Sequence, residues 1–345
     1  MTRPFEIEPL DASFGAVIRG VRLARLGDEA WRALHQTWLE YALLVLPGQH
    51  LTRDEQIAFA RRFGPLEIEM AAISNVRKDG SIRPESGNDD VVKVLKGNMG
   101  WHADSTYMPV QARGAVFSAE VVPDEGGETE FADMRAAWDA LDPAMRARIE
   151  PLAARHSLHY SQAKLGHAHG AGSDYNGYGF HDGPVPLRPL VKTHPETGRR
   201  SLLIGRHAHA IPGLAPDASE ALLDELLAFA CQPPRVYRHH WQPGDTVIWD
   251  NRCLLHRAMP WDMTKPRVMW HTRLAGDPVS EAARQGSQPA PSVGPAATPE
   301  PGVSGRGPGE IPVRRDAGRD ALGVDRLVPE AVRVDAAHTE LRRQR

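Results

Sequence analysis

The chain has 345 residues, 41% of them hydrophobic, and a formal net charge of -3 at pH 7. This length suits one large domain or two ordinary ones, and the apolar content is enough for a substantial core. The small net charge excludes the strong basic field that attracts nucleic acid. Cys231 and Cys253 lack the spacing of a zinc finger or redox pair, so we expect buried thiols in a reducing compartment. With no long apolar run and no apolar N-terminal signal segment, we expect a cytoplasmic protein with no membrane partner. A homo-oligomer is compatible with the sequence.

Hydrophobic patterning predicts short strands and helices along the first three quarters of the chain. The apolar run 42–46 is an expected strand that ends in a Pro-Gly-Gln turn. Thr52 and Glu55 then form a capping box that opens an amphipathic helix, and Gly64-Pro65 stops it. The other expected elements are a strand over 115–120, a helix with Asp142 as N-cap, a strand over 202–204, a helix from Asp217, and strands over 236–241, 246–249 and 267–274, with a tight turn at 242–245.

The strands are not separated by regular helices, so a doubly wound parallel sheet fits poorly. We expect a mainly β protein with flanking helices (α+β), in which the strands form a largely antiparallel barrel or sandwich. The composition changes near Pro278, because from Val279 onward there is no Phe, Trp or Tyr and the segment is rich in Pro, Gly and Ala. We therefore predict a folded domain over 1–278 and a mostly disordered tail over 279–345.

A histidine and an aspartate lie two positions apart in G-N-M-G-W-H-A-D-S-T-Y, residues 97–107. In an extended segment such positions point to the same face, so His102 and Asp104 can converge on one ion. His256 follows an apolar strand end in W-D-N-R-C-L-L-H-R-A, and a barrel could return it to this pair. Two histidines and one carboxylate match the facial triad of non-haem Fe(II) oxygenases. A catalytic zinc site could use the same ligands, and an ordinary buried histidine is the alternative for His256.

The stretch R-V-M-W-H-T-R-L places three basic side chains, Arg267, His271 and Arg273, on one face of an expected strand. Such a face inside an apolar strand is costly without anionic partners. Guanidinium groups bind carboxylates as a bidentate fork, so the pattern indicates a carboxylate-bearing co-substrate next to the metal. Cross-strand ion pairs are the simpler alternative.

Taken together, His102-x-Asp104, His256 and Arg267 resemble the signature of the Fe(II)/2-oxoglutarate dioxygenases of the TauD/TfdA family. The surrounding stretches agree: L-P-G-Q at 46–49, F-A-R-R-F-G at 59–64, E-G-G-E-T at 125–129 and W-D-N-R at 249–252. The resemblance covers about residues 5–276 and excludes the C-terminal segment. Within the family, the stretches around His102, Arg206 and Arg267 are similar to those of the (S)-phenoxypropionate and 2,4-dichlorophenoxyacetate (2,4-D) dioxygenases.

The resemblance implies a double-stranded β-helix (jelly-roll) core that binds Fe(2+) through His102, Asp104 and His256. It also implies that Arg267 and Thr129 bind the co-substrate 2-oxoglutarate, which is consumed with O2. One departure concerns the substrate: where the taurine enzyme has an arginine four residues beyond the clamp, this chain has His271, with Arg273 two further on. This difference favours a substrate carboxylate, bound by Arg273 together with His271, over a sulfonate. The predicted substrate contacts are Lys96, Asn98, Tyr107, Arg206, His207, His271 and Arg273.

The function implied is hydroxylation of a small carboxylate-bearing substrate such as an aryloxyalkanoate, (S)-phenoxypropionate or 2,4-D. Hydroxylation at the ether carbon gives a phenol and a 2-oxo acid, with succinate and CO2 from the co-substrate. A taurine or alkylsulfonate dioxygenase is the alternative within the family. From other classes, the alternatives are a zinc-dependent hydrolase with the same three ligands and a non-catalytic jelly-roll binding protein with a structural metal.

Overall fold

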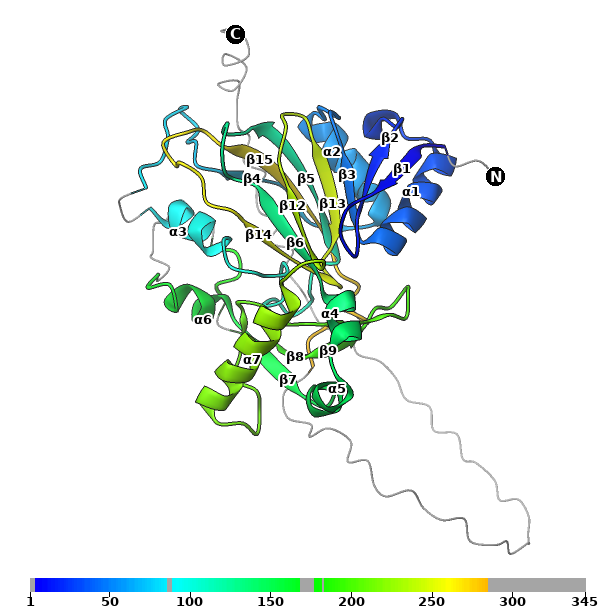
Figure 1. The fold of residues 1–345 in the computed structure, drawn as a ribbon. Helices are drawn as coiled ribbons and strands as arrows, with labels where there is room; N and C mark the ends of the chain where they lie inside the picture. Colours follow the sequence, from blue (N-terminus) through cyan, green and yellow to red (C-terminus); the bar gives the residue numbers. More distant parts are fainter. Residues whose placement is uncertain (1–3, 86–88, 168–176, 182, 285–345) are drawn as a thin grey trace, which may run out of the picture. The chain divides into compact units, whose positions relative to one another are not determined.

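The computed structural model describes residues 4–85, 89–167, 177–181 and 183–284. The strands are β1 (Glu6–Pro9), β2 (Ala16–Arg19), β3 (Leu43–Leu46), β4 (Leu66–Ser74), β5 (Gly114–Val121), β6 (Thr129–Asp133), β7 (Ala153–His156), β8 (Leu187–Pro189), β9 (Val191–Thr193), β10 (Arg200–Leu202), β11 (Ala208–His209), β12 (Val236–His239), β13 (Thr246–Asp250), β14 (Leu254–Ala258) and β15 (Val268–Leu274). The helices are α1 (Asp28–Tyr41), α2 (Arg53–Ala60), α3 (Asp90–Gly97), α4 (Met134–Ala140), α5 (Pro143–Ile149), α6 (Leu158–Ala163) and α7 (Pro216–Ala230), with short 3-10 turns at Leu23–Arg25 and Arg61–Phe63 (Figure 1).

Two sheets make the centre of the fold. The larger has seven strands in the order β1-β2-β3-β13-β5-β15-β4, and the smaller has three in the order β12-β6-β14. All pairings are antiparallel except β2 with β3. A buried cluster joins the two sheets, with Leu43 and Phe117 from the larger and Phe131 and Leu254 from the smaller. The sheets therefore face each other across an apolar layer, as in a sandwich.

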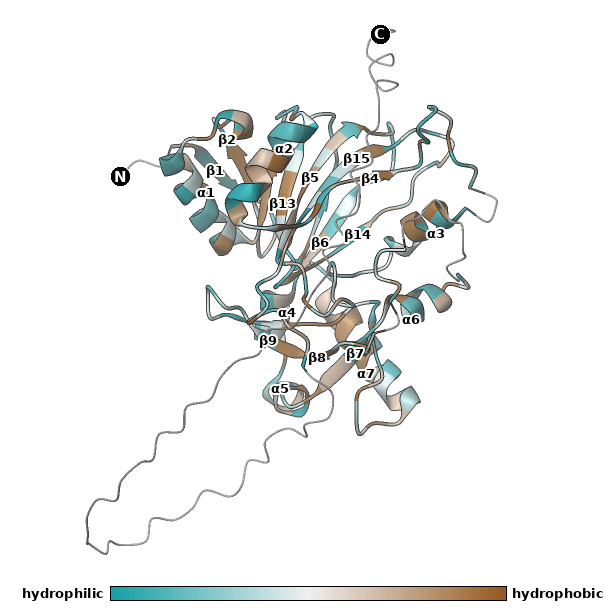
Figure 2. Ribbon diagram, turned by 180° about the vertical axis from the view of Figure 1, so that it is seen from behind, coloured by the Kyte–Doolittle hydropathy of each residue, from teal (hydrophilic) through white to brown (hydrophobic). Residues whose placement is uncertain are grey.

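The outer face of the seven-stranded sheet is covered by α1 and α2 (Figure 1). Alternation along β3 shows why its sequence is apolar at every position: Leu44 and Leu46 pack toward these helices, and Leu43 and Val45 pack toward the second sheet. Trp38 of α1 and Phe59 of α2 complete the outer core. Hydropathy colouring shows hydrophobic residues along the strands behind α2 and a mixed surface on the helices (Figure 2).

A third core lies under α4, α5 and α7, next to two small sheets, β11-β7-β8 and β10-β9. Trp101 and Ala103, the neighbours of His102, are buried in this core, as is Leu255, the neighbour of His256. Successive side chains of an extended segment point to opposite faces. Because Trp101, Ala103 and Leu255 point into this core, the side chains of His102 and His256 point away from it. The site therefore forms where this core meets the sandwich.

Most predicted elements are confirmed. The Thr52–Glu55 capping box is present at the start of α2, and Asp142 caps α5 by accepting from the Met145 amide. The predicted helix from Asp217 begins one residue earlier, at Pro216. The strand predicted over 202–204 is wrong by two residues, because β10 spans Arg200–Leu202 and Leu203 and Ile204 lie buried beyond it.

The fold class, mainly β with flanking helices, is confirmed. The described strands form separate sheets and do not close into a barrel. The domain boundary predicted at 278 falls before Glu281, which is 1% exposed and ion-paired with Lys192. The rest of the predicted tail, from residue 285 onward, lies outside the described residues. Within the described ranges no helix is long and apolar enough to cross a membrane.

Candidate metal and co-substrate site

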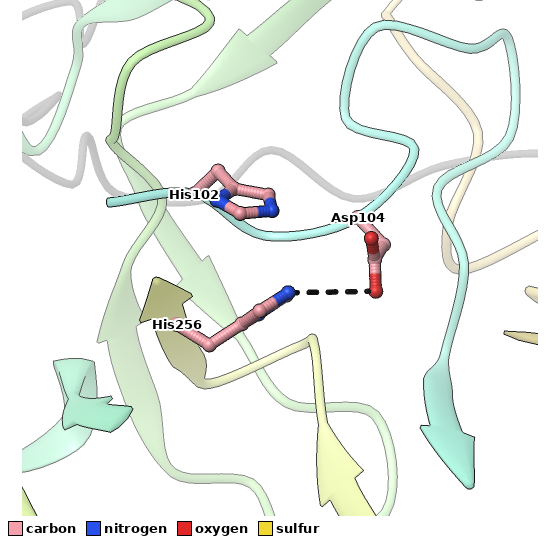
Figure 3. A group of neighbouring side chains, drawn as sticks. All are labelled: His102, Asp104 and His256. Carbon is pink, nitrogen blue, oxygen red and sulfur yellow. Dashed lines mark ion pairs between the residues drawn. The ribbon is translucent and has the colours of Figure 1, made fainter. Parts of the chain in front are cut away.

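His102, Asp104 and His256 come together at one end of the sandwich. One potential ligand atom from each lies within 4.8 Å of the others, and all three residues are buried. His102 and His256 pair as an antiparallel β-bridge, which sets their imidazoles side by side with ring centroids 4.3 Å apart. His256 Nε2 lies 3.8 Å from Asp104 Oδ2, and Figure 3 shows the three side chains pointing toward one another. The structure thus brings together the three residues predicted to bind metal.

The protonation states of the three groups suit a divalent metal. Burial lowers the pKa of His102 to about 3, with a further decrease from His256, and burial lowers the pKa of His256 to about 4. Burial alone would raise the pKa of Asp104, but Arg273 and the nearby imidazoles hold it well below its usual range. Two neutral imidazoles and one carboxylate are the donor set that metals require. The Gly100 carbonyl, 2.7 Å from His102 Nδ1, leaves Nε2 of that ring free to coordinate.

Asp104 is held in place by two residues on its outer side. Arg273 Nη2 donates to Asp104 Oδ1 at 2.9 Å, and Asn251 Nδ2 donates to Asp104 Oδ2 at 3.3 Å. The side-chain oxygen of Asn251, Oδ1, in turn accepts from the Trp249 indole at 2.9 Å, and this bond fixes the orientation of the side-chain amide. Arg273 and His271 were predicted to contact substrate; His271 Nε2 lies 3.7 Å from Asp104 Oδ2, so both stand beside the predicted metal ligand.

Arg267 is 2% exposed and precedes β15. Its Nε donates to the Gly127 carbonyl at 3.2 Å, and its guanidinium lies over the Trp261 ring. A Cβ on Gly127 would stand 3.1 Å from Arg267 Cδ, so glycine at that position allows the close approach. Among the described residues no carboxylate forms an ion pair with Arg267, and burial lowers its pKa to about 10 against the opposing effect of the Glu128 charge. A buried guanidinium of this kind is stabilised by an incoming carboxylate.

Thr129 is at the first position of β6, two residues after Gly127. Its hydroxyl accepts a hydrogen bond from the Trp241 indole at 3.0 Å, so its own proton is available for another acceptor. Asn75 supports Arg267 from the opposite direction, since its side-chain oxygen accepts from the Arg267 amide at 2.8 Å. No pattern in the sequence marks Trp241 or Asn75 as supports of this region.

His207 and Tyr107 lie beside the triad. The His207 ring centroid is 5.9 Å from that of His102 and 4.8 Å from that of Tyr107. His207 Nδ1 lies 2.8 Å from the Ser161 hydroxyl, which itself donates to the Leu158 carbonyl. His207 therefore donates through Nδ1 and keeps Nε2 as an acceptor.

Arg206 extends along the segment that precedes His102. Cβ atoms on Gly97 and Gly100 would come within 2.7 and 3.1 Å of its side chain. Arg206 donates to Gln162 Oε1 at 2.8 Å and to the Ser161 carbonyl. No carboxylate of the described segments pairs with it, and burial lowers its pKa to about 10. Arg206 is thus a second partly buried cation without an anion.

Asn98 and Lys96 are placed differently from the other predicted contacts. Asn98 caps the C-terminus of α3, and its backbone carbonyl accepts from the Ala258 amide at 2.9 Å. Lys96 Nζ is ion-paired with Glu85 at 3.2 Å on a partly exposed side of α3. Its ammonium thus already has an anionic partner.

A second group with metal-ligand side chains, His194, Asp250 and Cys253, is also buried. Here the Asp250 carboxylate already accepts from Arg252 through both Nε and Nη2 and lies 3.0 Å from His194 Nε2. Burial raises the pKa of the Cys253 thiol above its ordinary range, which opposes thiolate ligation. This group is a buried ion-pair network.

Comparison with known proteins identifies the family. Residues 6–273 match the model of the taurine catabolism dioxygenase TauD, TfdA family. The chain belongs to this family. It is 72% identical over 284 residues to the (S)-phenoxypropionate/alpha-ketoglutarate-dioxygenase of Sphingobium herbicidovorans, covering 82% of this chain and 99% of the relative. It is 39% identical to the alpha-ketoglutarate-dependent 2,4-dichlorophenoxyacetate dioxygenase of Cupriavidus pinatubonensis, covering 79% and 98%.

A solved structure, AAD-2 in complex with Mn(II) and N-oxalylglycine, superimposes with a TM-score of 0.73 at 35% identity, covering 81% of this chain and 99% of that one. N-oxalylglycine is an analogue of 2-oxoglutarate. The chain is accordingly a 2-oxoglutarate-dependent dioxygenase of the TauD/TfdA family. The predicted cofactor set of Fe(II), 2-oxoglutarate and O2 is confirmed at the level of the family.

Proposed function

We propose that this enzyme hydroxylates a small aryloxyalkanoate, such as (S)-phenoxypropionate or 2,4-D, at the carbon that carries the ether oxygen. The triad His102, Asp104 and His256 carries this proposal, together with the nearby cation Arg206, which is partly buried and has no carboxylate partner among the described residues. The 72% identical relative supports the substrate class.

In this proposal His102, Asp104 and His256 hold Fe(II), and Arg267 and Thr129 hold the distal carboxylate of 2-oxoglutarate. Bound Fe(II) supplies the activation of O2, coupled to decarboxylation of 2-oxoglutarate to succinate and CO2. The chain contributes orientation and exclusion of water. Arg267 fixes one end of the co-substrate, because its buried guanidinium gains a carboxylate partner that the described residues do not provide.

For the substrate we propose Arg206 as the main carboxylate contact. The sequence favours Arg273 for this role, but its Nη2 donates to Asp104 and its Nη1 to the Ser105 hydroxyl. The His207 ring lies beside both the His102 ring and the Tyr107 ring, and we propose that the aryloxy group occupies this region. The remaining candidate contacts, of lower rank, are Lys96, Asn98 and His271. Lys96 already pairs with Glu85, and His271 packs beside Asp104.

One atom of O2 goes into succinate and the other into the new hydroxyl at the ether carbon. The resulting hemiacetal breaks its bond to the aryloxy oxygen, the proton passes to that oxygen, and a phenol leaves. The carbon becomes the carbonyl of a 2-oxo acid: pyruvate from a phenoxypropionate and glyoxylate from a phenoxyacetate.

The test is a substrate panel of (R)- and (S)-phenoxypropionates, 2,4-D, taurine and an aliphatic sulfonate, with succinate and phenol measured separately. The proposal expects matched succinate and phenol from an aryloxyalkanoate. Succinate coupled to taurine alone would instead identify a sulfonate dioxygenase. Turnover supported by Zn(II) and not by Fe(II) would identify a hydrolase and overturn the proposal.

Several predictions from the sequence belong with this proposal. We propose that the two central sheets correspond to the jelly-roll of the family, and that the enzyme is cytoplasmic with no nucleic-acid or membrane partner. Size-exclusion chromatography with light scattering tests whether it is a homo-oligomer.

A further inference from the structure

A buried arginine outside the triad contacts the loop that follows Asp104. Arg188 of β8 is 2% exposed, and each of its three guanidinium nitrogens donates to a backbone carbonyl. Nε donates to Thr106 at 2.6 Å, Nη2 to Met108 at 2.6 Å and Nη1 to Glu281 at 3.0 Å. Its fork therefore joins two points of the loop 105–111 to a segment far along the chain.

That segment, residues 277–284, lies along the same loop. Its Glu281 carbonyl also accepts from the Gln111 amide at 3.0 Å, and the Ala283 amide donates to the Pro109 carbonyl at 2.8 Å. A Cβ on Gly276 would stand 1.9 Å from the Gln111 carbonyl oxygen, so the chain enters this contact through a position that only glycine fits. We call residues 277–284 the strap.

The strap is anchored at its centre by a buried charge. The Glu281 side chain is 1% exposed and forms an ion pair with Lys192 of β9. Burial lowers the pKa of Arg188 to about 10, and Glu281 raises it. Two buried cations, Arg188 and Lys192, thus depend on one carboxylate, an arrangement that is costly unless every member is satisfied.

The loop held by the strap connects to the triad at both ends. Asp104 immediately precedes it. At its other end, Gln111 Nε2 donates to the Asn251 backbone carbonyl at 3.0 Å, and Asn251 Nδ2 donates to Asp104 Oδ2. Displacing the strap would therefore release both the loop after Asp104 and the residue that orients its carboxylate.

We propose that Arg188 and Glu281 are positioning residues, which use the strap to hold Asp104 in the geometry that binds the metal. This inference rests on the proposed role of Asp104 as a metal ligand. Outer contacts of this kind affect metal affinity by roughly 10- to 100-fold. The strap follows β15, which is the last described strand in chain order. It is therefore an addition on the C-terminal side of the sandwich that completes the site.

The experiment measures Mn(II) affinity by calorimetry on the full chain, together with thermal unfolding. Arg188→Lys keeps the charge but loses the fork, and Glu281→Gln keeps the shape but loses the charge. We expect about 10-fold or greater weakening of Mn(II) binding in Arg188→Lys and a smaller loss in Glu281→Gln. The fold-loss of Mn(II) affinity in the double variant should be smaller than the product of the fold-losses in the two single variants, because both residues act through one network.

The matched control is Arg135→Lys. Arg135 is also 2% exposed and bonded to Asp133 and the Glu40 carbonyl, contacts that do not involve the loop or the strap. It should lower the unfolding temperature and leave Mn(II) affinity unchanged. Wild-type Mn(II) affinity in folded Arg188→Lys and Glu281→Gln would overturn the strap proposal alone. If Arg188→Lys does not fold, the Mn(II) affinity of Glu281→Gln alone tests the strap proposal. Failure of the wild-type chain to bind Mn(II) would overturn the proposed function with it.

Discussion

His102 and His256 exchange two backbone hydrogen bonds: the His102 amide donates to the His256 carbonyl at 3.0 Å, and the His256 amide donates to the His102 carbonyl at 2.8 Å. Two of the three predicted ligands are therefore fixed by main-chain pairing, the same interaction that joins strands of a sheet. Asp104 lies two residues beyond this bridge and depends on side-chain contacts for its position. The two histidines are thus held by main-chain pairing, whereas the carboxylate is held by side-chain contacts.

Asn251→Ala should weaken the metal site by removing one of the side-chain contacts that hold Asp104. The substitution removes the amide that donates to Asp104 Oδ2 and leaves the Trp249 indole without its acceptor. We expect Mn(II) affinity to fall by roughly 10- to 100-fold, measured by calorimetry, with a loss of about 1–3 kcal/mol in the free energy of unfolding.

The control for this variant is Ser201→Ala. Ser201 is fully buried and donates to the Arg252 carbonyl at 3.1 Å, one residue from Asn251. It loses a buried hydrogen bond of the same stretch without touching Asp104. Equal loss of stability in both variants with equal metal affinity would contradict the role given to Asn251.

Arg267→Ala should raise the KM for 2-oxoglutarate steeply. Removing one partner of a desolvated charge pair costs roughly 2–5 kcal/mol, which is at least about 30-fold in affinity. Arg257→Ala is the control, because Arg257 pairs with Glu130 at 2.6 Å and is one-third exposed. Steady-state kinetics at saturating aryloxyalkanoate measure the effect. An unchanged KM for the co-substrate would show that Arg267 is not its clamp.

The residues of the triad and Arg267 could be singled out from the sequence because their patterns are local. His102-x-Asp104 needs only an extended segment, and the basic face that begins at Arg267 is visible from alternation along one strand. The strands, the capping box at Thr52 and the α5 cap at Asp142 follow from patterns of a few residues for the same reason.

The supports of the site could not be predicted, because they depend on which distant segments meet. The sequence predicts that Arg273 contacts the substrate, yet in the structure it forms an ion pair with Asp104. Glu281 lies in a segment whose composition is that of a tail, and its burial comes from contacts with Lys192 and Arg188, which lie on two separate small sheets. No local pattern encodes such pairings.

Arg206→Gln and Arg273→Gln should separate substrate binding from metal binding. Arg206 has no carboxylate partner in the described part of the chain, so its loss should raise the KM for the aryloxyalkanoate by about 10-fold or more and leave Mn(II) affinity unchanged. Arg273 donates to Asp104, so its loss should weaken Mn(II) binding as well. Hydrogen bonds to charged groups contribute about 1.5–3 kcal/mol. The reverse pattern in the two variants would assign the substrate carboxylate to Arg273.

The two buried groups with metal-ligand side chains should differ in metal binding. The group at His194, Asp250 and Cys253 is satisfied by Arg252, and its thiol is held protonated by burial. We therefore expect about one Mn(II) per chain, on the grounds that a carboxylate already paired with a guanidinium is a poor ligand. His194→Ala should lower the unfolding temperature without changing this stoichiometry, whereas His102→Ala should abolish binding. A second equivalent of Mn(II) that disappears in His194→Ala would show that the ion-pair network is a metal site after all.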